Sequence, residues 1–311
     1  MLIGIDVGGT KNELVLCDNQ GHILNRLLAP GSNASEFGPE MAAARVAQQV
    51  ESLMAGREGA PVDALYAGLA GGTAPQTRKT VHEQLSARLP FVKAIDNGSD
   101  ALNGLYACVG ARDGMVVISG TGTSAFVRQG DRLIQVGGWG YLIDDAGGGY
   151  ALGRGAVNAA YRDYDGRGQK TLLTDMVIRQ VGLPLNEAIA VFYEGGKRMI
   201  ASFAPLVFEA AAAGDALARS LVDNACDELA LLIATCAKHL TGAPYLVGLS
   251  GSIWKADMIR EGVRARLSDD YRLLRADLPP VFGAAVAAAE LAGLDSGAAF
   301  HDAFKAGYDA L

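Results

Sequence analysis

Three clusters of small residues in the sequence could hold phosphate groups. They are Gly8, Gly9, Thr10 and Lys11; Gly120, Thr121 and Gly122; and Gly251 with Ser252. Glycine allows the backbone to approach a polyphosphate closely, and successive N–H groups in a tight turn form a concavity that binds anions. A single glycine-rich turn is weak evidence, because such turns are common in hairpins. Three of them in one chain predict a nucleotide site.

Other familiar motifs of nucleotide enzymes and hydrolases do not occur. The sequence contains no GxxxxGK(S/T) loop and no GxSxG nucleophile elbow. The nearest match to a dinucleotide-binding motif, Gly120-x-Gly122-x-x-Ala125, leads into a strand-like run rather than a helix. The sequence therefore argues against P-loop, Rossmann and α/β-hydrolase enzymes.

Asp96 and Asp100 are two carboxylates that could accept a proton from a substrate hydroxyl. Phosphoryl transfer to a hydroxyl group needs such a general base. Asp96 ends the strand-like run FVKAID, whereas Asp100 stands where a helical pattern begins. A carboxylate at a helix start is also a favoured cap, and the two roles are compatible. We favour Asp100 as the base and keep Asp96 as the alternative.

Two similar series of elements surround the first two glycine clusters. Strand-like runs at 2–7, 13–18 and 22–28 are repeated by runs at 114–118, 124–129 and 132–136, with a glycine-containing turn after each of the first two runs. This repetition indicates an internal duplication in which each copy opens one lobe.

The remaining patterns define the fold class and its boundaries. Helical and strand-like segments alternate between the two copies, and residues beyond 150 are mostly helical. We therefore expect an α/β protein of two lobes. The first lobe is expected at 1–112, with a terminal helix at 297–311 as a candidate addition to it, and the second at 113–296.

Composition excludes several classes of partner. The chain has 311 residues with a formal net charge of -7 and no stripe of Lys and Arg, so nucleic acid is not an expected partner. The apolar stretch 281–289 is broken by Glu290, and the first strand carries Asp6, which argues against a membrane span and a signal peptide. We expect a cytoplasmic protein without membrane contact.

The cysteines and histidines are too scattered for a metal centre. Cys17, Cys108, Cys226 and Cys236 form no CxxC pair, and the four histidines form no HExxH motif. Buried reduced thiols are the expected state of the cysteines.

Four motifs taken together carry a family resemblance. They are the segments at 6–11 (DVGGTK), 118–122 (ISGTG), 137–140 (GGWG) and 251–255 (GSIWK). They resemble the BadF/BadG/BcrA/BcrD ATPase family, and within it the N-acetylglucosamine kinases of the actin/hexokinase/Hsp70 superfold, from residue 3 to about 290. The resemblance implies two ribonuclease-H-like lobes, with mixed sheets and flanking helices, and ATP in the cleft between them.

The resemblance also implies roles for the residues that match these motifs. The first phosphate turn would be Gly8, Gly9, Thr10 and Lys11, and the second Gly120, Thr121 and Gly122. Asp6 would approach Mg²⁺ through water, and Gly251 with Ser252 would lie against the adenosine. Asp100 matches the catalytic aspartate of the family.

A sugar site is implied by four further matches, Asn33, Trp139, Gly140 and Asp145. Trp139 is equally compatible with a role as a core anchor. The family segment Gly-Asp-Glu-Gly-Ser is replaced here by residues 144–148 (DDAGG). This departure leaves open which sugar is bound and whether Asp144 or Asp145 contacts it.

The function implied is an ATP- and Mg²⁺-dependent kinase that phosphorylates the 6-hydroxyl of an amino sugar, N-acetylglucosamine first and glucosamine second. The alternative is an ATPase that activates a radical dehydratase through an iron–sulfur cluster shared across a dimer, but no cysteine lies in a Cys-Gly-Gly-Gln-like context. A sugar sensor is disfavoured because the chain begins directly with a strand, and the related ROK kinases because their zinc-binding cysteine cluster is absent. The oligomeric state stays open, with a homodimer as one option.

Overall fold

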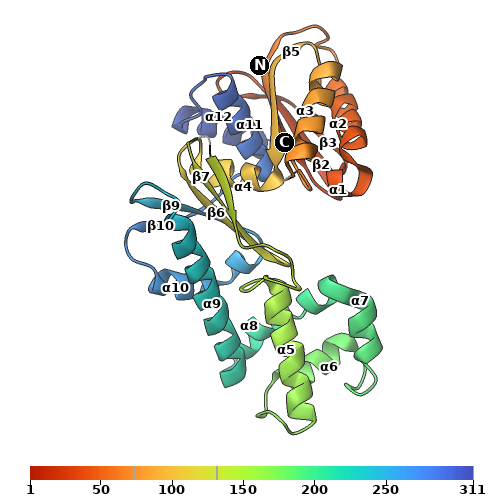
Figure 1. The fold of residues 1–311 in the computed structure, drawn as a ribbon, viewed down its shortest axis with the longest axis vertical. Coiled ribbons are helices and arrows are strands. Elements are labelled where there is room, and N and C mark those ends of the chain that lie inside the picture. The colour runs from red at the N-terminus through yellow and green to blue at the C-terminus, as the bar shows by residue number, and fades with distance from the viewer. Residues whose placement is uncertain (73, 131, 311) are drawn as a thin grey trace. The chain divides into compact units, whose positions relative to one another are not determined.

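The computed structural model describes residues 1–72, 74–130 and 132–310. These residues form two compact units, Met1–Val116 with Arg275–Leu311 and Val117–Leu274 (Figure 1). Each unit is built on one five-stranded sheet.

The first unit combines its sheet with helices on both faces. Its strands are β1 (Leu2–Val7), β2 (Lys11–Cys17), β3 (Ile23–Pro30), β4 (Val62–Leu69) and β5 (Val92–Ser99). Its helices are α1 (Ala34–Phe37), α2 (Pro39–Leu53), α3 (Pro75–Arg88), α4 (Asp100–Val109), α11 (Pro280–Leu291) and α12 (Ala298–Asp309). The strand order is β3-β2-β1-β4-β5, with β1 antiparallel to β2 and parallel to β4.

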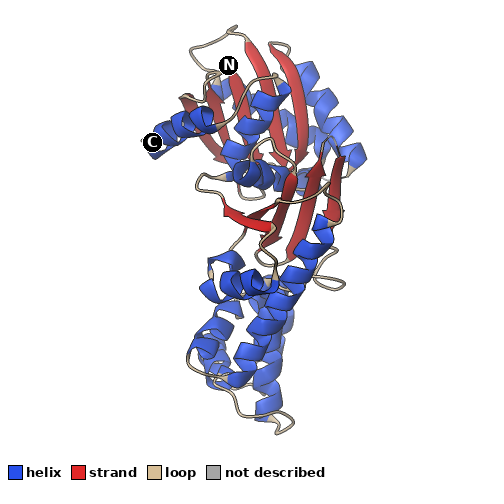
Figure 2. Ribbon diagram, turned by 90° about the vertical axis from the view of Figure 1, so that its left-hand side faces the viewer, coloured by secondary structure: helices blue, strands red, loops and turns tan. Residues whose placement is uncertain are grey.

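The first sheet is covered on both faces, which explains the nearly continuous apolar run of β1. On one face, Val46 and Val50 of α2 are buried with Val81 and Leu85 of α3. On the other face, α11 is buried from Val281 to Ala289. Figures 1 and 2 show these helices on opposite sides of the sheet.

Helix α11 packs on β1 and α4 with almost no space between backbones. A Cβ atom at Gly4 would lie 2.5 Å from the backbone N of Ala285, and one at Gly283 would lie 1.8 Å from the carbonyl oxygen of Asn103. This packing joins α11 to the first unit, whereas the sequence-based division put residues up to 296 in the second lobe. The apolar pattern predicts the helix but does not say which sheet it covers. Helix α12 also lies in the first unit.

The second unit adds a helical block to its sheet. Its strands are β6 (Gly114–Ser119), β7 (Thr123–Gln129), β8 (Arg132–Val136), β9 (Tyr245–Ser250) and β10 (Tyr271–Arg275), with β6 and β10 reaching across the unit boundary. Its helices are α5 (Gly149–Tyr164), α6 (Leu173–Val181), α7 (Ile189–Ala201), α8 (Ala204–Ala212), α9 (Ala216–Ala237), the short η1 (Ile253–Lys255) and α10 (Asp257–Arg266). Helices α5 to α8 pack together beyond the sheet (Figure 2).

The two sheets have the same topology. The order β10-β9-β6-β7-β8 in the second sheet, taken in reverse, places its third, second, first, fourth and fifth strands as in the first sheet. The internal duplication predicted from the repeated strand pattern is therefore confirmed. No helix in the described residues has the length and apolarity needed to cross a membrane.

We expect Gly283→Ala to lower the free energy of unfolding by about 1–3 kcal/mol, because the added methyl group would displace α11 from α4. Gly307→Ala in α12 is the matched control, since its Cβ would meet only Ile23, at 3.3 Å or more. The control gains helix propensity and should lose no stability. Urea denaturation of both variants measures the difference, and equal stabilities would contradict the packing described for α11.

Candidate nucleotide and sugar site

The predicted site residues divide between the two units. Asp6, Gly8, Gly9, Thr10, Lys11, Asn33 and Asp100 lie in the first, and Gly120, Thr121, Gly122, Trp139, Gly140, Asp145, Gly251 and Ser252 lie in the second.

The first glycine turn connects β1 to β2 and packs on the chain that follows β3. The N–H of Gly8 donates to the carbonyl of Lys11 at 3.1 Å and closes the turn. A Cβ at Gly31 would lie 2.3 Å from the carbonyl oxygen of Gly9, so only glycine fits there. The Lys11 side chain is exposed. The turn thus holds its backbone in a fixed position and leaves a lysine free for an anion.

Asn33 lies beside this turn as the N-cap of α1. Its Oδ1 accepts the N–H of Ser35 at 2.9 Å, and a Cβ at Gly9 would lie 3.8 Å from its Nδ2. Among the described residues, Nδ2 has no hydrogen-bond acceptor. The amide group of Asn33 can therefore donate to a ligand next to the first turn.

Asp6 is a poorly hydrated carboxylate at the end of β1. Burial raises the pKa of Asp6 to about 6, the hydrogen bond from Asn103 opposes this, and the negative charges of Asp100 and Glu13 add to it. The Nδ2 of Asn103 donates to Asp6 Oδ1 at 2.7 Å. The second carboxylate oxygen, Oδ2, has no hydrogen-bond donor in the described part of the chain.

Asp100 and Asp96 differ in their surroundings. Asp100 is the first residue of α4 and is open to solvent, although nearby protein atoms limit its hydration and raise the pKa of its carboxyl. The helix cap is Ser99, whose Oγ accepts from the N–H of Ala101, so capping is not the role of Asp100. Asp96 is bound by the Arg78 guanidinium at 2.9 and 3.0 Å. Asp100 is therefore the carboxylate without a positive partner.

The second glycine turn lies between β6 and β7 and contacts the third glycine cluster. A Cβ at Gly251, where φ is 103°, would lie 2.3 Å from the carbonyl oxygen of Ser119. Gly120, Thr121 and Ser252 line a pocket of about 500 Å³. Its other walls come from Gly149, Arg198, Ala201, Ser202, Ala204, Pro205, Phe208, Ile253, Lys255 and Ala256. A pocket of this size suits a ligand as large as a nucleoside.

Trp254 fixes the third cluster to the sheet. Its indole is 1% exposed, and its Nε1 donates to the carbonyl of Val117 in β6 at 2.9 Å. The same strand leads into the second glycine turn, so the two clusters are held at one edge of the sheet.

The segment after β8 presents apolar side chains to solvent. Trp139 is 61% exposed, which excludes the core-anchor role considered for it, and Leu142 and Ile143 are exposed by 82% and 79%. The segment turns back on itself, because the N–H of Asp144 donates to the carbonyl of Gly140 at 2.7 Å. An exposed indole offers an apolar face on which a sugar ring can stack.

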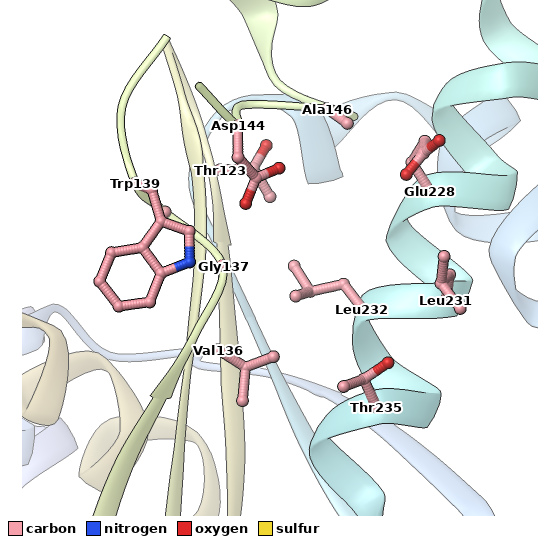
Figure 3. Close-up of a pocket in the computed structure, with 11 residues that line it drawn as sticks. Thr123, Val136, Gly137, Trp139, Asp144, Ala146, Glu228, Leu231, Leu232 and Thr235 are labelled. Atoms are coloured by element: carbon pink, nitrogen blue, oxygen red, sulfur yellow. The ribbon is translucent and has the colours of Figure 1, made fainter. Parts of the chain in front are cut away.

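Asp144 and Asp145 point to different surroundings. Asp144 lines a pocket of about 230 Å³ with Glu228 of α9 on its other wall, and Trp139 is at its edge (Figure 3). Asp145 is buried and accepts a hydrogen bond from the Lys197 ammonium at 2.7 Å. The two neighbouring carboxylates are therefore chemically distinct, one facing a pocket and one paired with a lysine.

Sequence reasoning missed several residues around these groups, namely Asn103, Lys197, Arg198, Glu228 and Lys255. Asn103 had a signal, since it is a polar residue within an otherwise apolar helical segment. Lys197 follows two glycines inside a helical pattern, which also marks an unusual position. Glu228 gave no signal, because it reads as an ordinary surface residue of α9.

A duplicated five-stranded sheet, with a glycine turn after the first strand of each copy, is the fold of the actin-like ATPases. The fold class expected from the sequence is confirmed. The chain belongs to the BadF/BadG/BcrA/BcrD ATPase family, whose model matches residues 3–288.

Named relatives of this chain are sugar kinases. It is 30% identical over 247 residues to the N-acetylmuramic acid/N-acetylglucosamine kinase of Clostridium acetobutylicum, covering 77% of this chain and 80% of that one. It is 27% identical to the glucosamine kinase of Vibrio cholerae, covering 81% and 84%. A solved structure from Chromobacterium violaceum, provisionally named N-acetylglucosamine kinase, superposes with a TM-score of 0.69 at 26% identity, covering 94% and 98%.

We expect Asp6→Asn to make the protein more stable above pH 6. The raised pKa means that the folded protein keeps a proton on Asp6 that the unfolded chain loses from about pH 3.8 upward, so stability falls as the pH rises from about 4 to about 6. Asparagine removes this loss, on the order of 1–3 kcal/mol at neutral pH, since one pKa unit equals about 1.4 kcal/mol.

Urea denaturation with EDTA, repeated from pH 4 to pH 8, measures this effect. The variant and the wild type should converge near pH 4 and separate as the pH rises. Parallel curves over the whole range would contradict the environment described for Asp6.

Proposed function

We propose that this protein transfers the γ-phosphate of ATP to the 6-hydroxyl of an amino sugar, with Asp100 as the proton acceptor. The observation that carries the proposal is the pair of glycine turns at equivalent positions in two copies of one sheet. Backbone N–H groups in such turns bind phosphate oxygens. The segment from Trp139 to Asp145 supports a sugar as the second substrate, because it joins an exposed aromatic ring to carboxylates.

At the coarser level, the chain is an ATP-dependent sugar kinase. The ATPase family model covers residues 3–288, and the relatives named as sugar kinases align over most of both chains. The sugar and the hydroxyl that receives the phosphate are the finer parts of the proposal.

The first unit would supply the groups that act on the acceptor hydroxyl. Asp100 has no positive partner in the described residues and is open to solvent, so its carboxylate can reach a substrate. A raised pKa also suits a general base, because proton transfer is most effective when the pKa lies nearer the working pH. Asn33 would donate its free amide N–H to a sugar oxygen, and Lys11 would bind phosphate beside the first turn.

The second unit would supply the nucleotide pocket. Gly120, Thr121 and Gly122 would bind phosphate oxygens through their N–H groups, and Gly251 with Ser252 would lie against the adenosine. The pocket of about 500 Å³ that joins Gly120 and Thr121 to Ser252 supports this arrangement. Arg198 and Lys255 on its rim provide positive charge for the phosphates.

The residues of the first unit fit a magnesium ion held with the nucleotide. Asp6 is a carboxylate whose Oδ2 has no donor in the described residues and whose ionisation is opposed by Asp100 and Glu13. Among those residues no three side chains gather as metal ligands, which agrees with binding through water and substrate phosphates. Mg²⁺ would offset the negative charge that develops on the transferred phosphoryl group. Asp6 would hold it, through water, from the end of β1.

One observation favours glucosamine as a second candidate substrate beside N-acetylglucosamine. The pocket between Asp144 and Glu228 has two carboxylates and no cationic side chain among its lining residues. The protonated amine of glucosamine would offset this charge, whereas an N-acetyl group is neutral. Ala146 lines the same pocket where a glutamate is usual in the family, which leaves room for the substituent on C2.

The test of this function is ADP release in the presence of ATP, Mg²⁺ and a panel of sugars. We expect glucosamine or N-acetylglucosamine to accelerate ADP release at least about tenfold over glucose, and phosphorus NMR to show a 6-phosphate product. Asp144→Asn and Glu228→Gln should reduce kcat/KM for glucosamine more than for N-acetylglucosamine. A protein that carries iron–sulfur absorbance and ignores every sugar would support the dehydratase activator instead.

A second prediction separates the two candidate bases. Asp100→Asn keeps the shape of the side chain but removes its basicity, so we expect kcat to fall by about 10² to 10⁴ while the KM for ATP changes little. Asp96→Asn is the control, since it breaks only a partly exposed ion pair with Arg78 and should leave kcat within about threefold. Folding of both variants is checked by circular dichroism. An active Asp100→Asn with an inactive Asp96→Asn would reverse the assignment.

A further inference from the structure

Helix α7 has a break in its backbone immediately before Lys197. Gly196 has φ 56° and ψ -151°, a conformation that L side chains rarely adopt, and it interrupts the helix. The next residue leaves the helix surface to reach the segment after β8. The Lys197 Nζ lies 2.7 Å from Asp145 Oδ2 and 5.3 Å from the centre of the Tyr141 ring.

Lys197 neutralises a carboxylate that has little contact with water. The Asp145 side chain is 5% exposed, against 32% for that of Lys197. The other oxygen of Asp145, Oδ1, accepts the N–H of Thr123 at 3.1 Å. Removing one partner of a buried ion pair leaves an uncompensated charge, which is strongly unfavourable. Without Lys197, Asp145 would have to move toward water or take up a proton.

Asp145 in turn lies directly on the second glycine turn. A Cβ at Gly122 would be 2.6 Å from Asp145 Oδ1, so the carboxylate contacts the turn backbone. The N–H of Gly149, the first residue of α5, donates to the carbonyl of Gly120 at 2.7 Å. The turn, Asp145 and the start of α5 therefore form one connected structure, and a shift of Asp145 would displace the turn.

We propose that Lys197 is a positioning residue for phosphate transfer, which holds the second glycine turn in place through the carboxylate of Asp145. The assignment rests on the proposed function, in which this turn binds phosphate. It gives Asp145 a structural task behind the turn, and it gives the broken helix α7 a reason to carry two glycines before Lys197. Because misplacement of reacting groups by about 1 Å costs on the order of 10² in rate, the tie matters for turnover.

The test begins with Lys197→Met, which keeps the length and the apolar part of the side chain. We expect kcat for the preferred amino sugar to fall about 10- to 100-fold, while the KM values for ATP and sugar change less than about threefold. Lys197→Arg should restore most of the rate, because a guanidinium can pair with the same carboxylate. Adding Asp145→Asn to Lys197→Met should recover part of it, since the unpaired buried charge is then removed.

Lys170→Met is the matched control in the same unit. The Lys170 Nζ lies 2.9 Å from Asp163 Oδ1, and the Asp163 side chain is also 5% exposed, but this pair has no contact with the glycine turn. We expect a similar small loss of stability from Lys170→Met and an unchanged kcat. If both lysine variants lower kcat equally, or if Lys197→Met keeps kcat within twofold, the proposal is wrong.

Amide hydrogen exchange makes the result independent of the sugar. In the protein without ligands, Lys197→Met should speed exchange in 119–123 and 145–150 at least about tenfold, and Lys170→Met should not. Unchanged exchange in these segments would also overturn the proposal. If exchange rises as expected but the wild type phosphorylates no sugar, the hold of Lys197 on the turn stands and the proposed kinase function fails.

Discussion

Close approach of one backbone to another, at glycine, is the constraint on which the rest of the structure depends. At the first turn, Gly31 leaves no space for a side chain beside Gly9, and at the second, Gly251 leaves none beside Ser119. The same holds where α11 meets β1 at Gly4. These contacts hold the turns without side chains between them, so the N–H groups stay accessible. A turn supported by larger side chains could not present its backbone to a phosphate in this way.

Negative charge next to these turns is the second constraint, and the two copies meet it differently. In the second unit, the ammonium of Lys197 compensates the buried Asp145 within the protein. In the first unit, Asp6 receives a hydrogen bond from Asn103 but no positive charge at that distance, and its pKa is raised to about 6. The second turn is thus electrostatically complete on its own. The first retains an affinity for a proton or a cation.

The sequence predicted those parts of the fold that follow from local pattern. The ends of β8, β9 and α12 agree with the predicted runs, because glycine, proline and alternating apolar residues mark them clearly. The side to which α11 belongs could not be predicted, since a helix that is apolar on all sides packs equally well on either sheet by pattern alone. The role of Lys197 was invisible for a related reason, as its partner Asp145 lies 52 residues earlier.

The duplication explains why one copy carries the reactive carboxylate. Asp100 begins α4 directly after β5, so its side chain is presented at the end of a strand, where parallel sheets place their functional groups. The fifth strand of the second copy, β10, instead leads through residues 276–279 into α11, a helix that belongs to the first unit. The second copy therefore has no helix start of its own at that position. Two units descended from one pattern have in this way divided the work, with the acid at the end of β5 in the first and the paired, rigid turn in the second.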